Sequence, residues 1–476
     1  MTAHRRPGDR RVRLSRARPE HVVLKPLRPA REPLSPAKTL VLGFAILIAL
    51  GTALLMLPWS TAEGASTDLV TALFTATSAA CVTGLVVVDT ATHWSAFGEV
   101  VLLLLIQAGG FGIMTGSTLL LYVIAGRRTR LHDRVVVQES LGGLELGNVT
   151  RVVGRIAVFT LVAEAVGAVI LLVAFMAGPE AGPRWHPQGI WWGVFHSVSA
   201  FNNAGFDLTG GFRSLTPFID DWVVLGTIAL LLLLGGLGWA IVADIFSGRR
   251  WRRLALETKL VVVVTAGLLV TGTVMIGFIE WANPETLGRL PAEQRFLNAA
   301  FESFTLRTAG FTALSPAGFA EASLFVVMGL MFIGGASGST AGGIKVNTFG
   351  LLGAAIWSTI RGRPSAEVFG RRIPHAIVYR ALAVALLSIA FVFLVGLGMA
   401  VTSEATFVEA LFEGVSAFGT VGASTGITPE LNDASRIIAI VGMFIGRLGP
   451  ITLVLALTAR VRPVPYRPAI ETIRIG

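Results

Sequence analysis

The chain has 476 residues, of which 53% are hydrophobic and only 14% are charged, and its mean hydropathy is +0.71. A soluble protein of this length carries about 25% charged residues. This composition therefore excludes a water-soluble enzyme and indicates a multispanning membrane protein. The single cysteine, Cys81, excludes a disulfide within the chain. The net charge of +10 suggests nucleic acid as a partner, but the positions of the basic residues argue against that function.

Residues 1–39 are predicted to form a flexible basic arm. They hold eleven Lys or Arg residues against three acids. A signal peptide needs an apolar core near its start, whereas the first apolar run begins only at Leu40.

Eight apolar stretches are long enough to cross about 30 Å of hydrocarbon at about 1.5 Å per residue. They cover residues 40–57, 95–126, 152–178, 218–246, 257–281, 320–360, 376–402 and 434–460. Shorter, semi-polar stretches separate the two members of each successive pair, at residues 67–79, 188–200, 293–305 and 405–417. These four are too short to span the bilayer and too apolar for a solvated loop, so they are predicted to be re-entrant segments.

The basic residues predict the orientation in the membrane. The arm and four further segments hold 31 of the 39 Lys and Arg residues but only nine of the 29 acids. The four segments are residues 126–155, 247–259, 361–380 and 460–476. Each of the five lies after an even number of spans, so the positive-inside rule predicts that all five, with both termini, are cytoplasmic. Basic segments beside anionic lipid head groups explain the net charge without nucleic acid.

The four re-entrant segments share one motif that runs from a Phe to a Gly. It reads FTATSAACVTGL from Phe74, FHSVSAFNNAGF from Phe195, FESFTLRTAGF from Phe301 and FEGVSAFGTVGA from Phe412. The Phe and the Gly are ten residues apart in three copies and nine apart in the third. The predicted fold class is an all-α membrane protein in which four span–pore-helix–span repeats surround a central pore with pseudo-fourfold symmetry.

The repeats predict how the chain is divided. The predicted segments are a basic cytoplasmic arm (1–39), pore repeats at 40–126, 127–246, 247–360 and 361–460, and a cytoplasmic tail (461–476).

The glycine in each motif indicates the chemistry of these loops. Glycine permits positive φ and close backbone approach, and irregular backbone at membrane depth survives only where it is buried or lines a water-filled path. Four such loops would supply rings of carbonyl oxygens that replace the hydration shell of a monovalent cation. Nearby acids are expected to raise the local cation concentration; they are Asp68, Glu302, Glu409 and Glu413. The alternative is that these loops are only tight turns packed on small residues. It fits any single loop, but it does not explain why four loops share the motif at the same place between two spans.

These motifs resemble the Trk/Ktr/HKT superfamily of potassium transport proteins, and most closely its KtrB-type subunit. The resemblance covers residues 40–460 and includes GGASGSTAGGIK at Gly334–Lys345 and GRLGPIT at Gly446–Thr452. It implies that the four loops form a selectivity filter. Some HKT members have Ser in the first loop and prefer sodium, so by resemblance Gly84 indicates potassium. The implied ion-binding carbonyls are those of Val82, Thr83, Gly84, Asn203, Ala204, Gly205, Thr308, Ala309, Gly310, Thr420, Val421 and Gly422.

The resemblance also implies a gate below the filter. Glycines interrupt the sixth apolar stretch, where each costs about 1 kcal/mol of helix propensity. By resemblance the interruption, residues 334–345 of the third repeat, is an intramembrane gating loop. The gating residues implied are Gly334, Gly335, Gly338, Gly342, Gly343, Lys345 and Arg447. A packing kink is the alternative. A phosphate-binding loop is excluded because the spacing does not fit the Walker form.

Two further residues of the apolar stretches have no assigned role. Glu164 lies in the middle of the third span, where a structural hydrogen bond and a functional role are equally open. Cys81 lies in the first filter loop, where a packing role is favoured over a redox role.

The expected function is potassium uptake across the cell membrane by a gated, channel-like pore subunit. The protein is not expected to be an enzyme. K⁺ is the expected transported ion, Na⁺ is a candidate activator, and no covalent cofactor is expected. By resemblance the partners are a second copy of the chain and a cytoplasmic nucleotide-binding regulatory ring of the KtrA/TrkA type. The basic loops are docking surfaces for that ring or ordinary lipid-facing loops. The alternative function is a sodium- or proton-coupled potassium symporter.

Overall fold

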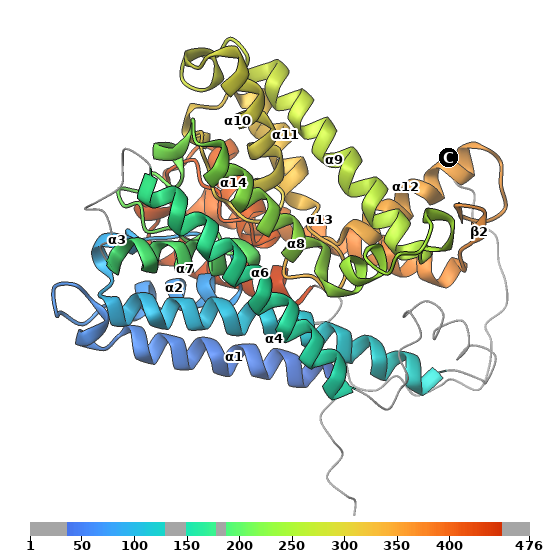
Figure 1. Cartoon of the computed structure of the whole chain (residues 1–476), viewed down its shortest axis with the longest axis horizontal. Coiled ribbons are helices and arrows are strands. Elements are labelled where there is room, and N and C mark those ends of the chain that lie inside the picture. Colours follow the sequence, from blue (N-terminus) through green and yellow to red (C-terminus); the bar gives the residue numbers. More distant parts are fainter. Residues whose placement is uncertain (1–35, 129–148, 178–186, 450–476) are drawn as a thin grey trace, which may run out of the picture. The chain divides into compact units, whose positions relative to one another are not determined.

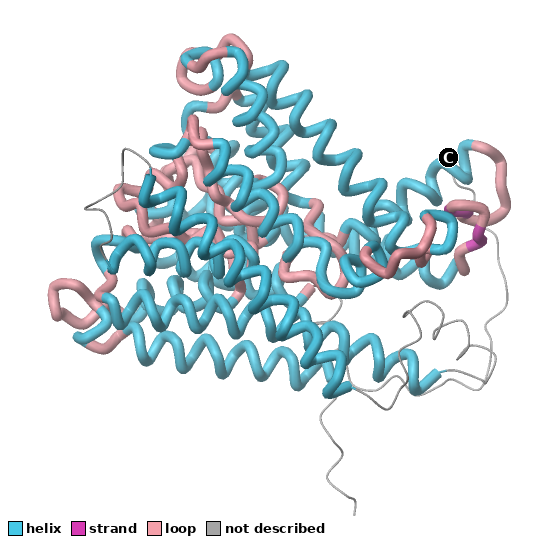
Figure 2. Tube along the Cα trace, in the orientation of Figure 1, coloured by secondary structure: helices cyan, strands magenta, loops and turns pink. Residues whose placement is uncertain are grey.

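A computed structural model describes residues 36–128, 149–177 and 187–449. Most of the predicted arm and all of the predicted C-terminal tail lie outside the described residues. In the described part, helices dominate, and a two-stranded antiparallel hairpin pairs β1 (Glu367–Val368) with β2 (Arg371–Arg372). Figure 2 shows this hairpin as the strand segment beside the loops and helices.

The helices follow the predicted order of span, short helix and span. Those of the first two repeats are α1 (Pro36–Leu55), α2 (Leu69–Ala80), α3 (Thr90–His93), α4 (Ala96–Arg128), α6 (Val149–Ala177), α7 (Pro187–Phe201) and α8 (Trp222–Ile245). Those of the last two repeats are α9 (Leu256–Glu280), α10 (Ala292–Thr305), α11 (Glu321–Phe332), α12 (Val346–Ile360), α13 (His375–Thr402), α14 (Phe407–Gly419) and α15 (Asp433–Leu448). Short 3₁₀ turns lie at Pro58–Ser60, Thr216–Phe218, Trp251–Arg253, Leu287–Arg289, Pro316–Gly318 and Thr428–Glu430.

Six described helices are long and apolar enough to cross a membrane: α1, α4, α6, α8, α9 and α13. The predicted sixth span is broken into α11 and α12 by the non-helical residues 333–345. The predicted eighth span begins as α15, and its predicted end lies outside the described residues. The all-α membrane fold expected from the sequence is therefore confirmed, with one span interrupted where the glycines cluster.

One span is less regular than its apolar sequence predicts. Helix α8 is kinked at Gly238, whose φ is 74°. A Cβ added there would lie 2.8 Å from the carbonyl oxygen of Gly338 in the broken span. The kink lets two backbones meet at a distance that any larger residue would prevent.

The four short helices α2, α7, α10 and α14 pack between or against the spans of their own repeats, and Figure 1 shows α2 beside α1 and α4. Local signals in the sequence start two of them. Asp68 accepts a hydrogen bond from the backbone of Thr71 at the start of α2, and Thr406 with Glu409 forms a capping box at the start of α14. The Phe that opens each motif is buried in a different apolar cluster, and each of these clusters contains residues of the neighbouring repeat, so the short helices help to join one repeat to the next.

Candidate functional site

The loops after three of the short helices begin with the same strained turn. Val82, Asn203 and Thr420 have φ angles of 58°, 61° and 49°. This left-handed region is uncommon for residues other than glycine and rare for β-branched residues such as Val82 and Thr420. In each loop the backbone N–H of the next residue donates to the carbonyl oxygen of a Ser five positions earlier, near the end of the short helix. This is the six-to-one bond of a Schellman motif. These bonds are Thr83 N to Ser78 O at 2.7 Å, Ala204 N to Ser199 O at 2.7 Å and Val421 N to Ser416 O at 3.0 Å.

The third loop, which is one residue shorter, turns differently. The carbonyl oxygen of Thr305 accepts hydrogen bonds from the N–H groups of Thr308, Ala309 and Gly310, at 3.0, 2.8 and 3.3 Å. In this loop positive φ appears only at the glycine, Gly310 (66°). The missing residue therefore removes the left-handed turn without changing where the loop ends.

The four loops close into one ring, which we call the central ring and define as residues 82–84, 203–205, 308–310 and 420–422. The motif glycine of each loop lies against the carbonyl oxygen that precedes the motif glycine of the next loop. A Cβ added to the glycine would approach that oxygen to between 2.1 and 2.3 Å. The four contacts are Gly84 with Ala204 O, Gly205 with Ala309 O, Gly310 with Val421 O and Gly422 with Thr83 O. The side chain of every non-glycine member is buried.

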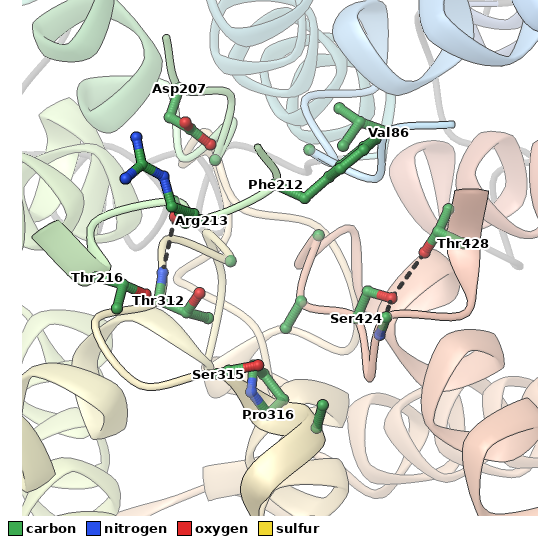
Figure 3. Close-up of a pocket in the computed structure, with 18 of the residues that line it drawn as sticks. Val86, Asp207, Phe212, Arg213, Thr216, Thr312, Ser315, Pro316, Ser424 and Thr428 are labelled. Carbon is green, nitrogen blue, oxygen red and sulfur yellow. Dashed lines mark hydrogen bonds between the residues drawn. The ribbon is translucent and has the colours of Figure 1, made fainter. Parts of the chain in front are cut away.

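A cavity of about 760 Å³ opens on one side of the central ring. All four motif glycines contribute to its lining, together with residues from the loops that follow them. Figure 3 shows Asp207, Thr312 and Ser424 facing this space from three different loops. The ring is thus the floor of a vestibule to which every repeat contributes.

The acids expected to concentrate cations lie elsewhere. Glu302 and Glu413 are fully buried. Glu302 Oε1 accepts hydrogen bonds from the backbone N–H groups of Ala313 (2.8 Å) and Leu314 (2.9 Å). Asp68 and Glu409 cap helices instead of lining the vestibule. None of the four acids lines the vestibule, and their bonded carboxylate oxygens accept from backbone or hydroxyl groups, so an effect on the local cation concentration stays a prediction.

Sequence reasoning missed a shared structural role for the residue that follows the motif Phe. In repeats two to four this residue is His196, Glu302 and Glu413. His196 Nε2 accepts from Leu208 N at 3.4 Å, and Glu413 Oε1 accepts from Thr428 Oγ1 at 3.0 Å. Each of these side chains thus forms a hydrogen bond with the segment that follows its ring loop. The available signal was a polar residue at a fixed place in an otherwise apolar motif.

The Gly-rich loop, residues 333–345, packs directly against the central ring and α8. Its backbone donates hydrogen bonds from Ala336 to Gly236 O (2.8 Å) and from Thr340 to Gly235 O (3.2 Å). A Cβ on Gly342 would lie 2.1 Å from Thr420 Oγ1 of the ring. The loop therefore touches the ring at a place where only glycine fits.

The other residues implied in gating also meet at this loop. A Cβ on Gly334 would contact Gly342 O, a Cβ on Gly335 would contact Gly236 O, and Gly338 and Gly343 have positive φ. Lys345 Nζ donates to the carbonyl oxygen of Ala341 within the loop.

Arg447 of α15 ties the Gly-rich loop to the first repeat. Its side chain is 2% exposed. Nη1 donates to the carbonyl oxygen of Thr340, and Nη2 donates to that of Gly109 at 3.0 Å. The structure thus brings Arg447 to the loop as the resemblance implied, and Cys81 of the first ring loop is fully buried.

Glu164 lies outside the central ring, and its two carboxylate oxygens are hydrogen-bonded. Oε1 accepts from Asn202 Nδ2 at 3.0 Å and Oε2 accepts from Gln107 Nε2 at 3.3 Å. Asn202 directly precedes the second ring loop and also donates to Gln107 Oε1 at 2.9 Å. This arrangement favours a structural role for Glu164. Among the described residues, no group of three or more His, Cys, Asp or Glu could hold a metal ion.

Comparison with known proteins agrees with this architecture. A family model described as TrkH, cation transport protein, matches residues 37–462. Ktr system potassium uptake protein B of Bacillus subtilis is 39% identical over 88% of this chain and 92% of its own length. The potassium/sodium uptake protein NtpJ of Enterococcus hirae is 38% identical over 94% of this chain and 98% of its own length.

The fold has a counterpart among solved structures. The crystal structure of the potassium transporter TrkH from Vibrio parahaemolyticus has a TM-score of 0.70 and covers 91% of this chain and 87% of its own. Its sequence identity is 20%, so this likeness shows the fold alone. Because the family model covers most of the chain and the relatives share well over 30% identity, the chain is a multi-pass membrane protein, not an enzyme, and it belongs to the TrkH family of cation transport proteins.

Proposed function

We propose that this protein takes up potassium across the cell membrane through the central ring, which acts as its selectivity filter. The observation that carries the proposal is the closure of the ring, in which each of the four motif glycines lies against a carbonyl oxygen of the next loop. The printed names of the relatives, which are potassium uptake proteins, support K⁺ as the transported ion.

The physical basis is the substitution of water by carbonyl oxygens. Four loops can present several layers of carbonyls to one ion, and such rings replace the hydration shell of a monovalent cation. The C-terminal ends of the four short helices lead into the ring, and their partial negative charge favours a cation. The glycines bring the four backbones close enough for one ion to be shared.

We further propose that the Gly-rich loop is the gate. Two contacts support this role: the loop packs against the ring at Gly342, and Arg447 donates to the carbonyl oxygen of Thr340 in the loop. Arg447 adds a positive charge there, which opposes a cation as long as the loop stays in place.

The chain is proposed to act as a homodimer on a cytoplasmic nucleotide-binding ring of the KtrA/TrkA type, with both of its termini in the cytoplasm. The sequence holds no dinucleotide fingerprint of its own, so nucleotide control would come from that partner. The exposed basic residues before α9, such as Arg250 and Arg252, are candidate contacts for it.

Cation flux through the purified chain in liposomes tests the function. We expect K⁺ to be preferred over Na⁺, and a deletion within residues 336–343 to raise the basal flux without any partner. Repeating the K⁺ measurement with added Na⁺ tests Na⁺ as an activator. If the chain together with its regulatory ring moves no cation, the proposal is wrong. If the reversal potential follows Na⁺ or H⁺ as well as K⁺, the alternative of a coupled symporter is favoured.

A further inference from the structure

A continuous chain of side-chain hydrogen bonds joins the Gly-rich loop to two loops of the central ring. Thr340 Oγ1 donates to Asn203 Oδ1 at 2.9 Å, and Asn203 Nδ2 donates to Thr308 Oγ1 at 2.6 Å. All three side chains are at most 1% exposed. Each donor and acceptor in this chain is therefore removed from water and depends on its protein partner.

At the Gly-rich loop, both backbone polar groups of Thr340 are hydrogen-bonded. The backbone N–H of Thr340 donates to Gly235 O at 3.2 Å, and its carbonyl oxygen accepts from Arg447. The position of the Thr340 hydroxyl is consequently set by the position of the Gly-rich loop. A shift of the loop by more than about 1 Å would stretch the bond to Asn203 beyond hydrogen-bonding distance.

At its other end, this series of hydrogen bonds reaches Asn203, next to a contact between two ring loops. Asn203 has the left-handed backbone of its loop, with φ at 61°. The next residue, Ala204, supplies the carbonyl oxygen that lies against Gly84. The side-chain amide of Asn203 thus links the second ring loop to Thr308 in the third. Asn203 directly precedes Ala204, so this bond also constrains the position of the Ala204 carbonyl.

The other polar side chains of the ring have no such link. In the described part of the chain, neither Thr83 Oγ1 nor Thr420 Oγ1 has a hydrogen-bond partner. The side-chain connection between the loop and the ring therefore runs through Asn203.

We propose that Thr340 and Asn203 are positioning residues through which the Gly-rich loop sets the ion selectivity of the central ring. With the loop in the position described here, the chain of hydrogen bonds holds the second and third ring loops at the spacing that suits K⁺. When the loop moves away, the link to Asn203 breaks and the preference for K⁺ over Na⁺ falls. This inference rests on the proposed function, because it takes the ring as the filter and the loop as the gate.

The test measures the K⁺/Na⁺ permeability ratio of the full chain in liposomes. Thr340→Val keeps the shape of the side chain but removes the hydroxyl, and we expect the ratio to fall about fivefold. Thr340→Ser restores the hydroxyl and is expected to restore the ratio. Ser339→Ala is the matched control, because its hydroxyl is buried in the same loop and has no hydrogen-bond partner among the described residues.

A second variant separates selectivity from folding. Thr308→Val interrupts the same chain at its far end, and the double variant with Thr340→Val should lower the ratio no further than either single change, because coupled sites are not additive. An unchanged ratio in a folded Thr340→Val or Thr308→Val protein would overturn the inference, as would a Thr340→Ser protein no better than Thr340→Val. A wild-type chain that conducts no K⁺ even together with its regulatory ring would instead refute the proposed function.

Discussion

Replacing Gly84 by Ser tests the contact that closes the central ring. Gly84 has a φ of 91°, and a Cβ added there would lie 2.3 Å from the carbonyl oxygen of Ala204. Ordinary contact begins at 3.4 Å, so one of the two backbones must move by about 1 Å. A side chain in this backbone region also costs about 1–3 kcal/mol. Both effects act on the position of a carbonyl that faces the proposed ion path.

We expect the serine variant to lose about tenfold in K⁺/Na⁺ permeability ratio, which corresponds to about 1.4 kcal/mol of discrimination. The assay is cation flux in liposomes with each ion tested alone and in competition. Gly64→Ser is the matched control, since Gly64 also has a positive φ (71°) but no atom lies within 4 Å of the added Cβ. It carries the same kind of backbone strain without displacing the ring.

The reasoning would be refuted by a folded Gly84→Ser protein that keeps the wild-type ratio. Such a result would mean that the contact between Gly84 and Ala204 does not set the spacing of the carbonyls. A loss of selectivity in Gly64→Ser of the same size would assign the effect to general strain.

Three other changes give separate outcomes. Glu302→Ala leaves two buried backbone N–H groups unpaired, so we expect a loss of about 1–3 kcal/mol of stability, seen as a lower melting temperature in detergent; a melting temperature equal to wild type would contradict the anchoring role. Arg447→Gln weakens the attachment of the Gly-rich loop and should raise basal K⁺ flux, whereas lower flux in a folded protein would contradict a role in closure. Burial lowers the pKa of His93, in the segment between α2 and α4. The unfolded chain then binds more protons, so stability should decrease as the pH falls below about 6.5. His93→Gln should flatten that dependence in a melting series over pH.

The sequence predicted the periodic parts of the fold well because apolar length and re-entrant pattern are local properties. The short helix predicted at 293–305 is α10 (Ala292–Thr305), and the one predicted at 188–200 is α7 (Pro187–Phe201). The sequence also located the interruption of the sixth span, because glycine is costly in a helix. The role of each ring residue in ion binding remains a prediction.

The contacts between repeats could not be predicted, because they depend on how distant loops meet. The kink at Gly238 lies where the Gly-rich loop packs against α8, and nothing in the local sequence of α8 predicts that neighbour. The backbone contacts of Glu302 could not be predicted for the same reason, since an acid beside such a motif has the same local sequence whether its carboxylate faces ions or the backbone. The bond between Thr340 and Asn203 joins residues 137 positions apart.

The closure of the central ring has a consequence for the synthesis of the protein. The contact between Gly422 and Thr83 joins the last repeat to the first, about 340 residues earlier. At roughly 5–20 residues per second, the first loop waits about 20–70 s for its neighbour to be made. During that time its left-handed turn and buried polar groups have no partner on one side. The ring is thus complete only when the fourth repeat has been made, and a chain that ends before the fourth loop would leave the ring open.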